Sequence, residues 1–384
     1  MIAPPVIRAL ADETPFRVAE AGRVLSPALI IHRDRAAQNI ATTLRLLGGD
    51  PSRWRPHVKT AKLGYVMGML VEAGVRQFKC ATSLELRVAC AAGAADVLVA
   101  YPLVGPAATR VRAIADAHPD VRVSVLAESA AQLESWQGSR MGIFVDVNPG
   151  MNRTGVPQEQ GREITDLCRA IAAAGLEFAG VHYYDGHLSK YGLEERMELA
   201  PRGYDCLMEL VASLGAAGFP VPEVITAGTP AFPCSLAYQP FRTAGFVHRV
   251  SPGTVVYCDT TALAQLPEEY GYVPAAVVMT RVVSHPAPQT VTCDAGHKTV
   301  SADAGVPTCQ VLGHPELEPL APSEEHLPMK VAADARRPAI GEVLYLAPRH
   351  VCPTVNNFDD ALIVSGGRVL GVERVSARGR ERPL

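Results

Sequence analysis

The chain has 384 residues, of which 48% are apolar and 20% charged, so it has the ordinary composition of a globular protein and the length of one large domain with a smaller one. A formal charge of −3 attracts neither nucleic acid nor anionic lipid, and no apolar run has membrane-spanning length, so we expect no nucleic-acid and no membrane partner. The N-terminal residues do not follow the pattern of a signal peptide and the nine cysteines show no pairing pattern, which predicts free thiols and a cytoplasmic protein.

The first predicted element is a strand within residues 24–32. From about residue 54 to 250, short apolar runs then alternate with amphipathic stretches. The predicted strands are 55–58, 77–81, 97–100, 122–127, 142–147, 178–183, 223–227 and 246–250. The predicted helices between them are 61–73, 83–92, 106–118, 129–136, 158–174 and 202–217. This alternation predicts an α/β fold, a parallel (β/α)8 TIM barrel. An open doubly wound sheet is the alternative, but no G-x-G-x-x-G motif follows the first strand.

The pattern changes after about residue 250, where helical periodicity nearly disappears. Apolar runs are separated there by proline, glycine and charged turns, at 275–283, 289–293, 298–301, 342–346 and 361–364. Such a pattern is typical of a mostly antiparallel β domain. We therefore predict a barrel over 33–250, a β domain over 251–384, and an N-terminal segment, 1–32, whose strand joins the β domain.

In a (β/α)8 barrel the chemistry takes place at the C-terminal ends of the strands. Lys59 ends the first predicted strand, because Pro56 keeps the chain before it extended and an amphipathic pattern begins after it. A partly buried lysine can act as a nucleophilic amine in Schiff-base chemistry, as pyridoxal phosphate requires. A solvated loop lysine is the alternative interpretation.

Two loops are candidates for a phosphate site. Thr226, Gly228 and Thr229 follow the seventh predicted strand, and Gly253 and Thr254 follow the eighth. Barrels commonly bind phosphate there, through backbone N–H groups and hydroxyls. Either loop alone is also typical of an ordinary turn, so their joint position carries the prediction.

Further polar residues follow the fifth and sixth predicted strands. Asp146 and Arg153 follow the fifth, and His182 and Tyr184 follow the sixth. The planar guanidinium of Arg153 could bind a ring oxygen of the cofactor or a substrate carboxylate. The hydroxyl of Tyr184 could meet a pyridine nitrogen. A surface arginine and a packed aromatic ring are the alternatives.

His350 and Cys352 form a candidate metal site. Residues two apart in an extended segment project to the same face, so an imidazole and a thiolate can bind one ion there. Zinc accepts nitrogen and sulfur ligands, with manganese or magnesium as alternatives, and two protein ligands leave positions for substrate oxygens. A lone His-x-Cys pair also occurs by chance.

Taken in order, these motifs resemble those of the fold-type III pyridoxal-phosphate enzymes, and within them the D-threonine aldolase and D-serine dehydratase group, whose N-terminal barrel is like that of alanine racemase. The resemblance spans nearly the whole chain. It is carried by Arg55-Pro56-His57-Val58-Lys59-Thr60, Ala100-Tyr101-Pro102, Asn152-Arg153-Thr154-Gly155, Tyr184-Asp185-Gly186-His187, Pro252-Gly253-Thr254, Asp294-Ala295-Gly296, Ser323-Glu324-Glu325-His326 and His350-Val351-Cys352-Pro353.

The resemblance implies a head-to-tail homodimer with its active sites near the interface, and a metal next to the cofactor. It implies that Lys59 holds pyridoxal 5′-phosphate and that Arg153 and Tyr184 contact its ring. The implied phosphate residues are Thr226, Gly228, Thr229, Gly253 and Thr254, and the implied metal ligands are His350 and Cys352. The chain departs from many relatives at Ala61, where they have a histidine, so any proton-handling role of that histidine is absent or moved.

The expected activity is a lyase reaction on a D-3-hydroxy amino acid. The cofactor makes the Cα–H and Cα–Cβ bonds labile, and a metal on the β-hydroxyl serves either dehydration or retro-aldol cleavage. The His-x-Cys pair resembles the dehydratase branch more than the aldolase branch, so we expect D-serine or D-3-hydroxyaspartate to yield a 2-oxo acid and ammonia, with Lys59 removing the Cα proton. Retro-aldol cleavage to glycine and an aldehyde is the alternative. An amino-acid racemase and a non-enzymatic pyridoxal-phosphate carrier are further alternatives.

Overall fold

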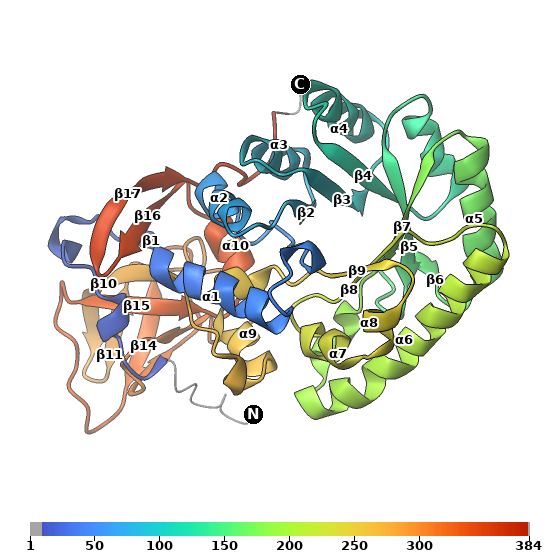
Figure 1. Ribbon diagram of the computed structural model, residues 1–384. Coiled ribbons are helices and arrows are strands. Elements are labelled where there is room, and N and C mark those ends of the chain that lie inside the picture. Colours follow the sequence, from blue (N-terminus) through green and yellow to red (C-terminus); the bar gives the residue numbers. More distant parts are fainter. Residues whose placement is uncertain (1–9, 383–384) are drawn as a thin grey trace. The chain divides into compact units, whose positions relative to one another are not determined.

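A computed structural model describes residues 10–382 of the chain, which divide into two compact units (Figure 1). The first unit comprises the chain up to Thr43, Thr60–Val66 and Thr254–Gly379. The second unit comprises Leu44–Lys59, Met67–Gly253 and the chain from Arg380 onward. Residues 1–9 of the predicted N-terminal segment and the last two residues of the predicted β domain lie outside the described residues.

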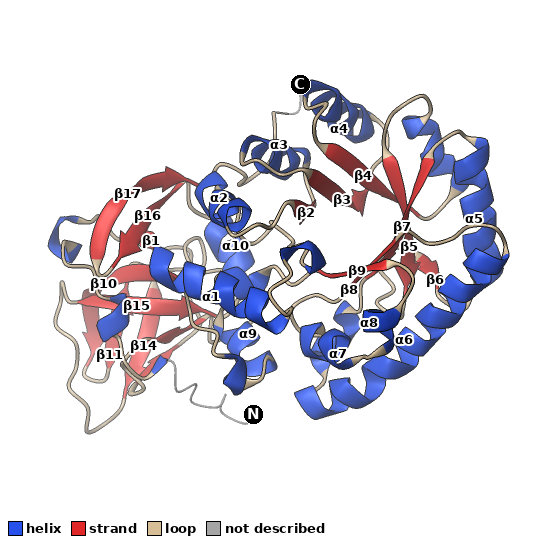
Figure 2. Cartoon of the chain, viewed as in Figure 1, coloured by secondary structure: helices blue, strands red, loops and turns tan. Residues whose placement is uncertain are grey.

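The second unit is built on a parallel sheet, which Figure 2 shows with its helices on the outside. Along the sheet the strands follow the order β2 (Gln77–Cys80), β3 (Asp96–Pro102), β4 (Arg122–Ala127), β5 (Gly142–Asn148), β7 (Glu177–Tyr183), β8 (Glu223–Thr226) and β9 (Val247–Val250), and β6 (Val156–Pro157) pairs with β5. Seven of the eight predicted barrel strands thus form where the apolar runs placed them. Their inward side chains include a buried cluster of Leu98, Leu126, Phe144, Ala179 and Ile225.

The extended segment 54–58 takes the eighth place and closes the barrel. The backbone N–H of Arg55 donates to the carbonyl of Val250 at 2.9 Å, and that of Val58 donates to the carbonyl of Lys79 at 2.7 Å. These bonds join the segment to β9 on one side and to β2 on the other, with both bridges parallel. Pro56 has no N–H to donate, which is why the segment bridges its neighbours without forming a regular strand. The predicted (β/α)8 barrel is therefore confirmed.

Most helices of this part of the chain follow the predicted periodicity, with two corrections and two short helices that were not predicted, at 232–237 and 240–243. Residues 129–136 form a 3-10 helix, η5 (Ala130–Trp136), and the helix predicted to begin at residue 202 begins at Leu193. The periodic burial of Arg196, Ala200 and Tyr204 carries that helix through Pro201. The α-helices are α2 (Gly64–Glu72), α3 (Ser83–Ala91), α4 (Pro106–Ala117), α5 (Gly161–Ala173), α6 (Leu193–Ala216), α7 (Phe232–Ala237) and α8 (Pro240–Thr243), with short 3-10 turns at η4 (Pro51–Arg53) and η6 (Gly186–Lys190).

The first unit is a mostly antiparallel sheet. Its main strand order is β13 (Leu317–Pro319), β14 (Leu327–Val331), β11 (Thr290–Cys293), β10 (Ala276–Ala287), β1 (Ala28–His32), β16 (Asp360–Ser365) and β17 (Arg368–Arg374). In addition, β15 (Val343–Pro348) pairs with β10 and β12 (Cys309–Val311). The N-terminal strand β1 is antiparallel to β10 and parallel to β16. Successive residues of β10 and β15 enter two different buried clusters, so both faces of the sheet are covered.

Two features of the first unit differ from the predictions. Residues 298–301 form no strand, because the backbone N–H groups of Thr299 and Val300 both donate to the carbonyl of Gly296 and wind the chain into a turn. Helices that the sequence did not predict are α1 (Arg33–Leu46), α9 (Thr260–Gln265) and α10 (Val351–Asn356), with 3-10 turns at η2 (Thr14–Phe16), η3 (Ala21–Arg23), η7 (Thr254–Val256) and η8 (Glu268–Tyr270). None of the helices between residues 10 and 382 has the length and apolar character needed to cross a membrane.

Candidate active site

Lys59 lies at the carboxyl end of the segment that closes the barrel. Its side chain is half-buried, and its backbone N–H donates to Nδ1 of His57 at 3.3 Å. The start of the segment is held by Arg55, which is fully buried and donates to the carboxylates of Asp96 at 2.8 Å and Glu223 at 2.9 Å. Buried ion pairs of this kind hold the backbone in one register, because breaking them leaves an unpaired charge in the interior. Lys59 is therefore presented at the barrel mouth by a rigid support.

The loop after β8 has the features of an anion site. Ala227 has a left-handed backbone conformation, with a φ of +57°. A Cβ added to Gly228 would lie 2.9 Å from the ring of Tyr184, so the backbone at Gly228 approaches that ring closely. The buried hydroxyl of Thr229 has no hydrogen-bond partner among residues 10–382. The hydroxyl of Thr226, in contrast, is already paired with that of Ser235 at 2.7 Å, so Thr226 would bind an anion through its backbone N–H. An unpaired buried hydroxyl on a glycine loop fits a phosphate oxygen.

Gly253 follows β9 and packs directly against the backbone of the extended segment 54–58. A Cβ added to Gly253 would lie 2.2 Å from the carbonyl oxygen of His57, so only glycine fits. The adjacent Pro252 accepts a hydrogen bond from Nε1 of Trp54 at 2.9 Å, and the hydroxyl of Ser251 donates to the carbonyl of Arg55 at 2.8 Å. The second candidate phosphate loop is thereby joined to the segment that carries Lys59.

Arg153 and Tyr184 come together in the structure. The guanidinium carbon of Arg153 lies 5.0 Å from the ring centroid of Tyr184, a cation–π distance. The loop that carries Arg153 is held by Asn148, whose Oδ1 accepts the backbone N–H groups of Gly150 and Asn152, each at 3.0 Å. This arrangement leaves the Arg153 side chain exposed and able to meet a ligand.

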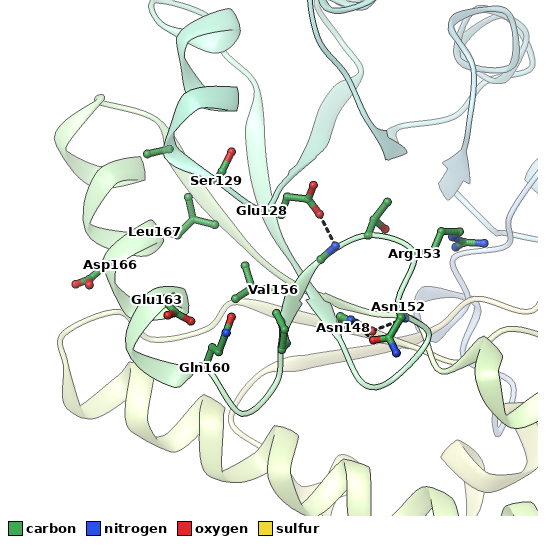
Figure 3. A pocket seen from close by; sticks show the side chains of 14 residues that line it. Glu128, Ser129, Asn148, Asn152, Arg153, Val156, Gln160, Glu163, Asp166 and Leu167 are labelled. Atoms are coloured by element: carbon green, nitrogen blue, oxygen red, sulfur yellow. Dashed lines mark hydrogen bonds between the residues drawn. The ribbon is translucent and has the colours of Figure 1, made fainter.

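A cavity of about 870 Å³ lies beside the same loop, on the side of α5 (Figure 3). Its lining includes Glu128, whose carboxylate accepts the backbone N–H of Gly155, and the acidic side chains of Glu163 and Asp166. In Figure 3 the Arg153 side chain points away from Glu163 and Asp166. The cavity is thus bordered by the Arg153 loop, and Arg153 itself is among its lining residues.

Three charged or titratable side chains meet inside the barrel. Nζ of Lys79, on β2, lies 3.3 Å from Nε2 of His182, on β7, and Nδ1 of His182 lies 2.7 Å from Oδ1 of Asp146, on β5. Burial, as the largest cause, and the charge of Lys59 together lower the pKa of Lys79 to about 7, against the opposing effect of Asp185. Lys79 also lies 5.7 Å from the ring centroid of Tyr184. Lys79 therefore belongs to the same site as Lys59 and Tyr184.

Sequence reasoning placed Asp146 and His182 at strand ends but missed Lys79. A signal was present, because Lys79 is a charged residue in the middle of a short parallel strand that is buried on both faces. A second group of the site, Asp185, is 1% exposed and accepts a hydrogen bond from the hydroxyl of Tyr204 at 2.7 Å. Burial raises the pKa of Asp185 to about 6, although that hydrogen bond acts in the opposite direction.

The candidate metal ligands His350 and Cys352 belong to the first unit. The predicted extended segment was wrong: His350 is the N-cap of α10 and Cys352 lies in its first turn. The helix forms because the carboxylate of Asp259 accepts the backbone N–H of Val351 at 2.9 Å, and because Pro353 is compatible with a first helical turn. The pair is nevertheless close, because an extended N-cap followed by a helical turn also brings residues two apart together.

The surroundings of the pair are suited to a metal. Nδ1 of His350 lies 2.7 Å from a carboxylate oxygen of Asp303, which leaves Nε2 for an ion, as in many histidine metal sites. The hydroxyl of Thr60 lies 3.0 Å from Sγ of Cys352 and that of Thr254 3.8 Å. Burial lowers the pKa of His350, but the hydrogen bonds and charges of Cys352 and Asp303 outweigh burial and raise it to about 9. Across residues 10–382 no group of three or more His, Cys, Asp or Glu side chains is arranged around a common ion position.

Comparison with protein families gives two matches along the chain. The model of the alanine racemase N-terminal domain matches residues 31–261, and that of a putative serine dehydratase domain matches residues 275–364. The first match alone covers more than half of the chain.

Several characterised proteins resemble the chain over nearly its whole length. D-threonine aldolase of Arthrobacter sp. is 26% identical, with 98% of this chain and 99% of the relative covered. D-threo-3-hydroxyaspartate dehydratase of Delftia sp. strain HT23 is 26% identical, with 87% and 92% covered. Among solved structures, D-threonine aldolase from Filomicrobium marinum superimposes with a TM-score of 0.85 at 28% identity, covering 94% of this chain and 96% of that chain. The similarity thus extends to both aldolases and dehydratases.

Proposed function

Because the chain belongs to the fold-type III pyridoxal-phosphate enzymes, in the group of D-threonine aldolase and D-serine dehydratase, we propose that it is a lyase that dehydrates D-3-hydroxy amino acids to a 2-oxo acid and ammonia. The substrates we propose are D-serine and D-3-hydroxyaspartate. The observation that carries the choice of dehydration is the imidazole and thiol pair of His350 and Cys352, which resembles that of the dehydratase branch.

The residues of the barrel unit fit pyridoxal phosphate. A half-buried amine, Lys59, stands at the barrel mouth, and the buried hydroxyl of Thr229 lacks a partner among residues 10–382. The close approaches at Gly228 and Gly253 keep side chains out of the two loops that would surround the phosphate. Bound to Lys59, the cofactor supplies an electron sink for bonds at the substrate Cα.

The proposed roles of the protein groups follow from their chemistry. Lys59 would hold the cofactor, and its free amine would take the proton from the substrate Cα. Arg153 and Tyr184 orient the ring, since their side chains already stack on one another. The backbone N–H groups of the Thr226–Thr229 and Gly253–Thr254 loops, with the Thr229 hydroxyl, bind the phosphate.

The proposed metal ligands are Nε2 of His350 and Sγ of Cys352. Nitrogen and sulfur donors suit zinc, which as a Lewis acid on the substrate β-hydroxyl would help it leave. Asp303 fixes the ring orientation of His350, and Thr60 holds the thiol of Cys352. By the same resemblance we propose a homodimer with active sites near the interface.

Retro-aldol cleavage to glycine and an aldehyde is the second candidate, favoured by the similarity to D-threonine aldolases in sequence and in structure. It uses the same cofactor and the same position for the β-hydroxyl, so the residues of the barrel unit serve either reaction. The two reactions differ in which bond at Cα or Cβ breaks, and therefore in their products.

One experiment separates these activities. The purified protein, loaded with pyridoxal phosphate, is incubated with D-serine, D-threonine and D-3-hydroxyaspartate, with zinc, with manganese or with a chelator. The products are assayed separately as 2-oxo acid, glycine and L-enantiomer. We expect 2-oxo acid and ammonia in equal amounts, lost on chelation. Glycine as the main product would replace dehydration by aldol cleavage, L-enantiomer without a metal requirement would indicate a racemase, and no product from any substrate would indicate a carrier.

A further inference from the structure

Lys79 is a second lysine of the barrel unit, and the proposed reaction as described above does not use it. It is 3% exposed, and its backbone lies directly beside the segment that carries Lys59: the Lys79 N–H donates to the carbonyl of Pro56 at 2.9 Å, and the Lys79 carbonyl accepts from Val58 at 2.7 Å. Lysine is almost never fully buried unless it has partners. The position therefore needs an explanation beyond packing.

The partners of Lys79 lie across the barrel interior. Its Nζ reaches Nε2 of His182 at 3.3 Å, although β2 and β7 are not neighbours in the sheet. Asp146 accepts from His182 at 2.7 Å and from the hydroxyl of Thr154 at 2.8 Å. Lys79, His182 and Asp146 thus form a continuous hydrogen-bonded chain, which we call the interior relay.

The direction of the interior relay follows from the hydrogen-bond inventory. A carboxylate only accepts, so Nδ1 of His182 carries the hydrogen and Nε2 presents a lone pair. Lys79 must then donate one of its N–H groups to His182. In its neutral form the amine keeps its own lone pair for another proton, so the relay orients Lys79 as an acceptor.

The charges around Lys79 keep both of its protonation states accessible. Lys59 and Arg55 oppose a positive charge on it, while Asp185 and Asp146 favour one. With burial as the largest effect, the pKa of Lys79 is lowered to about 7. Burial also lowers the pKa of His182, and the charges of Lys79 and Arg153 lower it further, against Asp146, so His182 stays neutral while Lys79 titrates.

We propose that Lys79, oriented by His182 and Asp146, is the proton acceptor for Lys59. This inference rests on the proposed function, in which the amine of Lys59 takes a proton from the substrate Cα. The ammonium of Lys59 then loses one N–H bond, whose electron pair remains on its nitrogen, and the proton forms a new N–H bond on the neutral amine of Lys79. Lys79 returns the proton to product or water at the end of the cycle. Lys79 acts through Lys59, so it is a positioning and proton-accepting group, and Lys59 remains the residue that contacts the substrate.

The first test concerns Lys79 itself and needs no activity. In the protein without cofactor, carbon-13 NMR of the lysine side chains is followed between pH 5 and pH 11, and the Lys79 signal is the one that is missing in Lys79→Met. We expect that signal to titrate near pH 7. A titration midpoint of about 10.4, the pKa of an exposed lysine, would overturn the proposal. The surface variant Lys298→Met, which removes an exposed lysine paired with Glu324 and Glu325, controls for the assignment.

The second test uses the loaded enzyme. Lys79→Met and Lys79→Arg are both expected to lower kcat by about 10²- to 10⁴-fold, because neither can accept a proton near neutral pH. In both variants borohydride should still attach the cofactor to Lys59. The acid limb of the pH profile near pH 7 should disappear, and methylamine in solution should restore part of the activity of Lys79→Ala. A wild-type pH profile in Lys79→Arg, or no rescue by methylamine, would show that Lys79 supplies only charge or packing.

The proposed function and the proposed role of Lys79 can be tested separately. If borohydride leaves Lys59 unlabelled in the wild-type protein, the proposed function fails, whatever the NMR titration shows. If Lys59 is labelled and the enzyme is active, but Lys79→Met retains the wild-type kcat and pH profile, only the role of Lys79 fails. Should Lys79→Met not fold, His182→Leu removes the acceptor of Lys79 while leaving both lysines, and we expect it to shift the acid limb of the profile.

Discussion

The hydroxyl oxygen of Thr60 lies 3.0 Å from the sulfur of Cys352. Thr60 is fully buried, and it directly follows Lys59 in the chain. The residue next to the candidate cofactor lysine thus contacts a candidate metal ligand.

This contact predicts that Thr60→Val weakens metal binding. Valine keeps the shape of threonine but cannot donate to the thiolate, and losing such a supporting hydrogen bond typically costs about 10- to 100-fold in metal affinity. Competition with a chromogenic chelator measures the zinc affinity of the variant. Thr280→Val, which removes a buried hydroxyl bonded to Asp294 in the same unit, is the matched control. Equal zinc affinity in Thr60→Val and the wild type would remove the contact from the proposed metal site.

Two threonines of one loop are predicted to behave in opposite ways. Thr229→Val removes a buried hydroxyl that has no partner among residues 10–382, so it should leave the stability unchanged or slightly raised while pyridoxal phosphate dissociates about 10-fold more readily. Thr226→Val breaks the bonds to Ser235 and His248 and should lower the free energy of unfolding by about 1–3 kcal/mol. Denaturant unfolding without cofactor and cofactor titration by absorbance measure the two effects. Undiminished cofactor affinity in Thr229→Val would count against a phosphate at this loop.

A methyl group at Gly253 is predicted to displace the segment that carries Lys59. The added Cβ would lie 2.2 Å from the carbonyl oxygen of His57, which is backbone and cannot rotate away. We expect Gly253→Ala to destabilise the protein by about 1–3 kcal/mol and to reduce the cofactor absorbance. Gly245→Ala is the control, because no atom lies within 4 Å of the Cβ that the substitution would add. Normal stability and normal cofactor binding in Gly253→Ala would show that this close approach is not maintained in solution.

Asp185 is predicted to make stability fall as the pH rises. Because its folded pKa is raised from 3.8 to about 6, the native state holds more protons than the unfolded state between these values. Burial of Asp185 therefore does not lower the free energy of unfolding below pH 3.8, where the carboxyl is protonated in both states. About 3 kcal/mol of stability is lost as the pH rises through 6. Asp185→Asn should be more stable than the wild type at pH 8 and similar to it at pH 4, in denaturant unfolding without cofactor. A difference between the two proteins that does not change with pH would contradict the raised pKa.

Much of the barrel could be predicted from short-range patterns. Seven apolar runs became strands, because parallel strands buried on both faces need continuous apolar side chains, and the runs between them became helices. Pro56 keeps the chain before it extended and an amphipathic pattern begins after Lys59, so the position of the candidate cofactor lysine at a strand end was also predictable. The helix at 351–356 was not, because its N-terminus is capped by Asp259, which lies far from it in sequence.

The sequence by itself determined where Lys59, Arg153, Tyr184 and the two glycine loops fall relative to strand ends, since side-chain periodicity and turn residues act over a few positions. Only the tertiary structure decided that Lys79 meets His182, 103 residues away, and that Asp146 orients both. Which side chains face each other across a closed barrel depends on strand order and register, and these are set by the packing of the whole sheet.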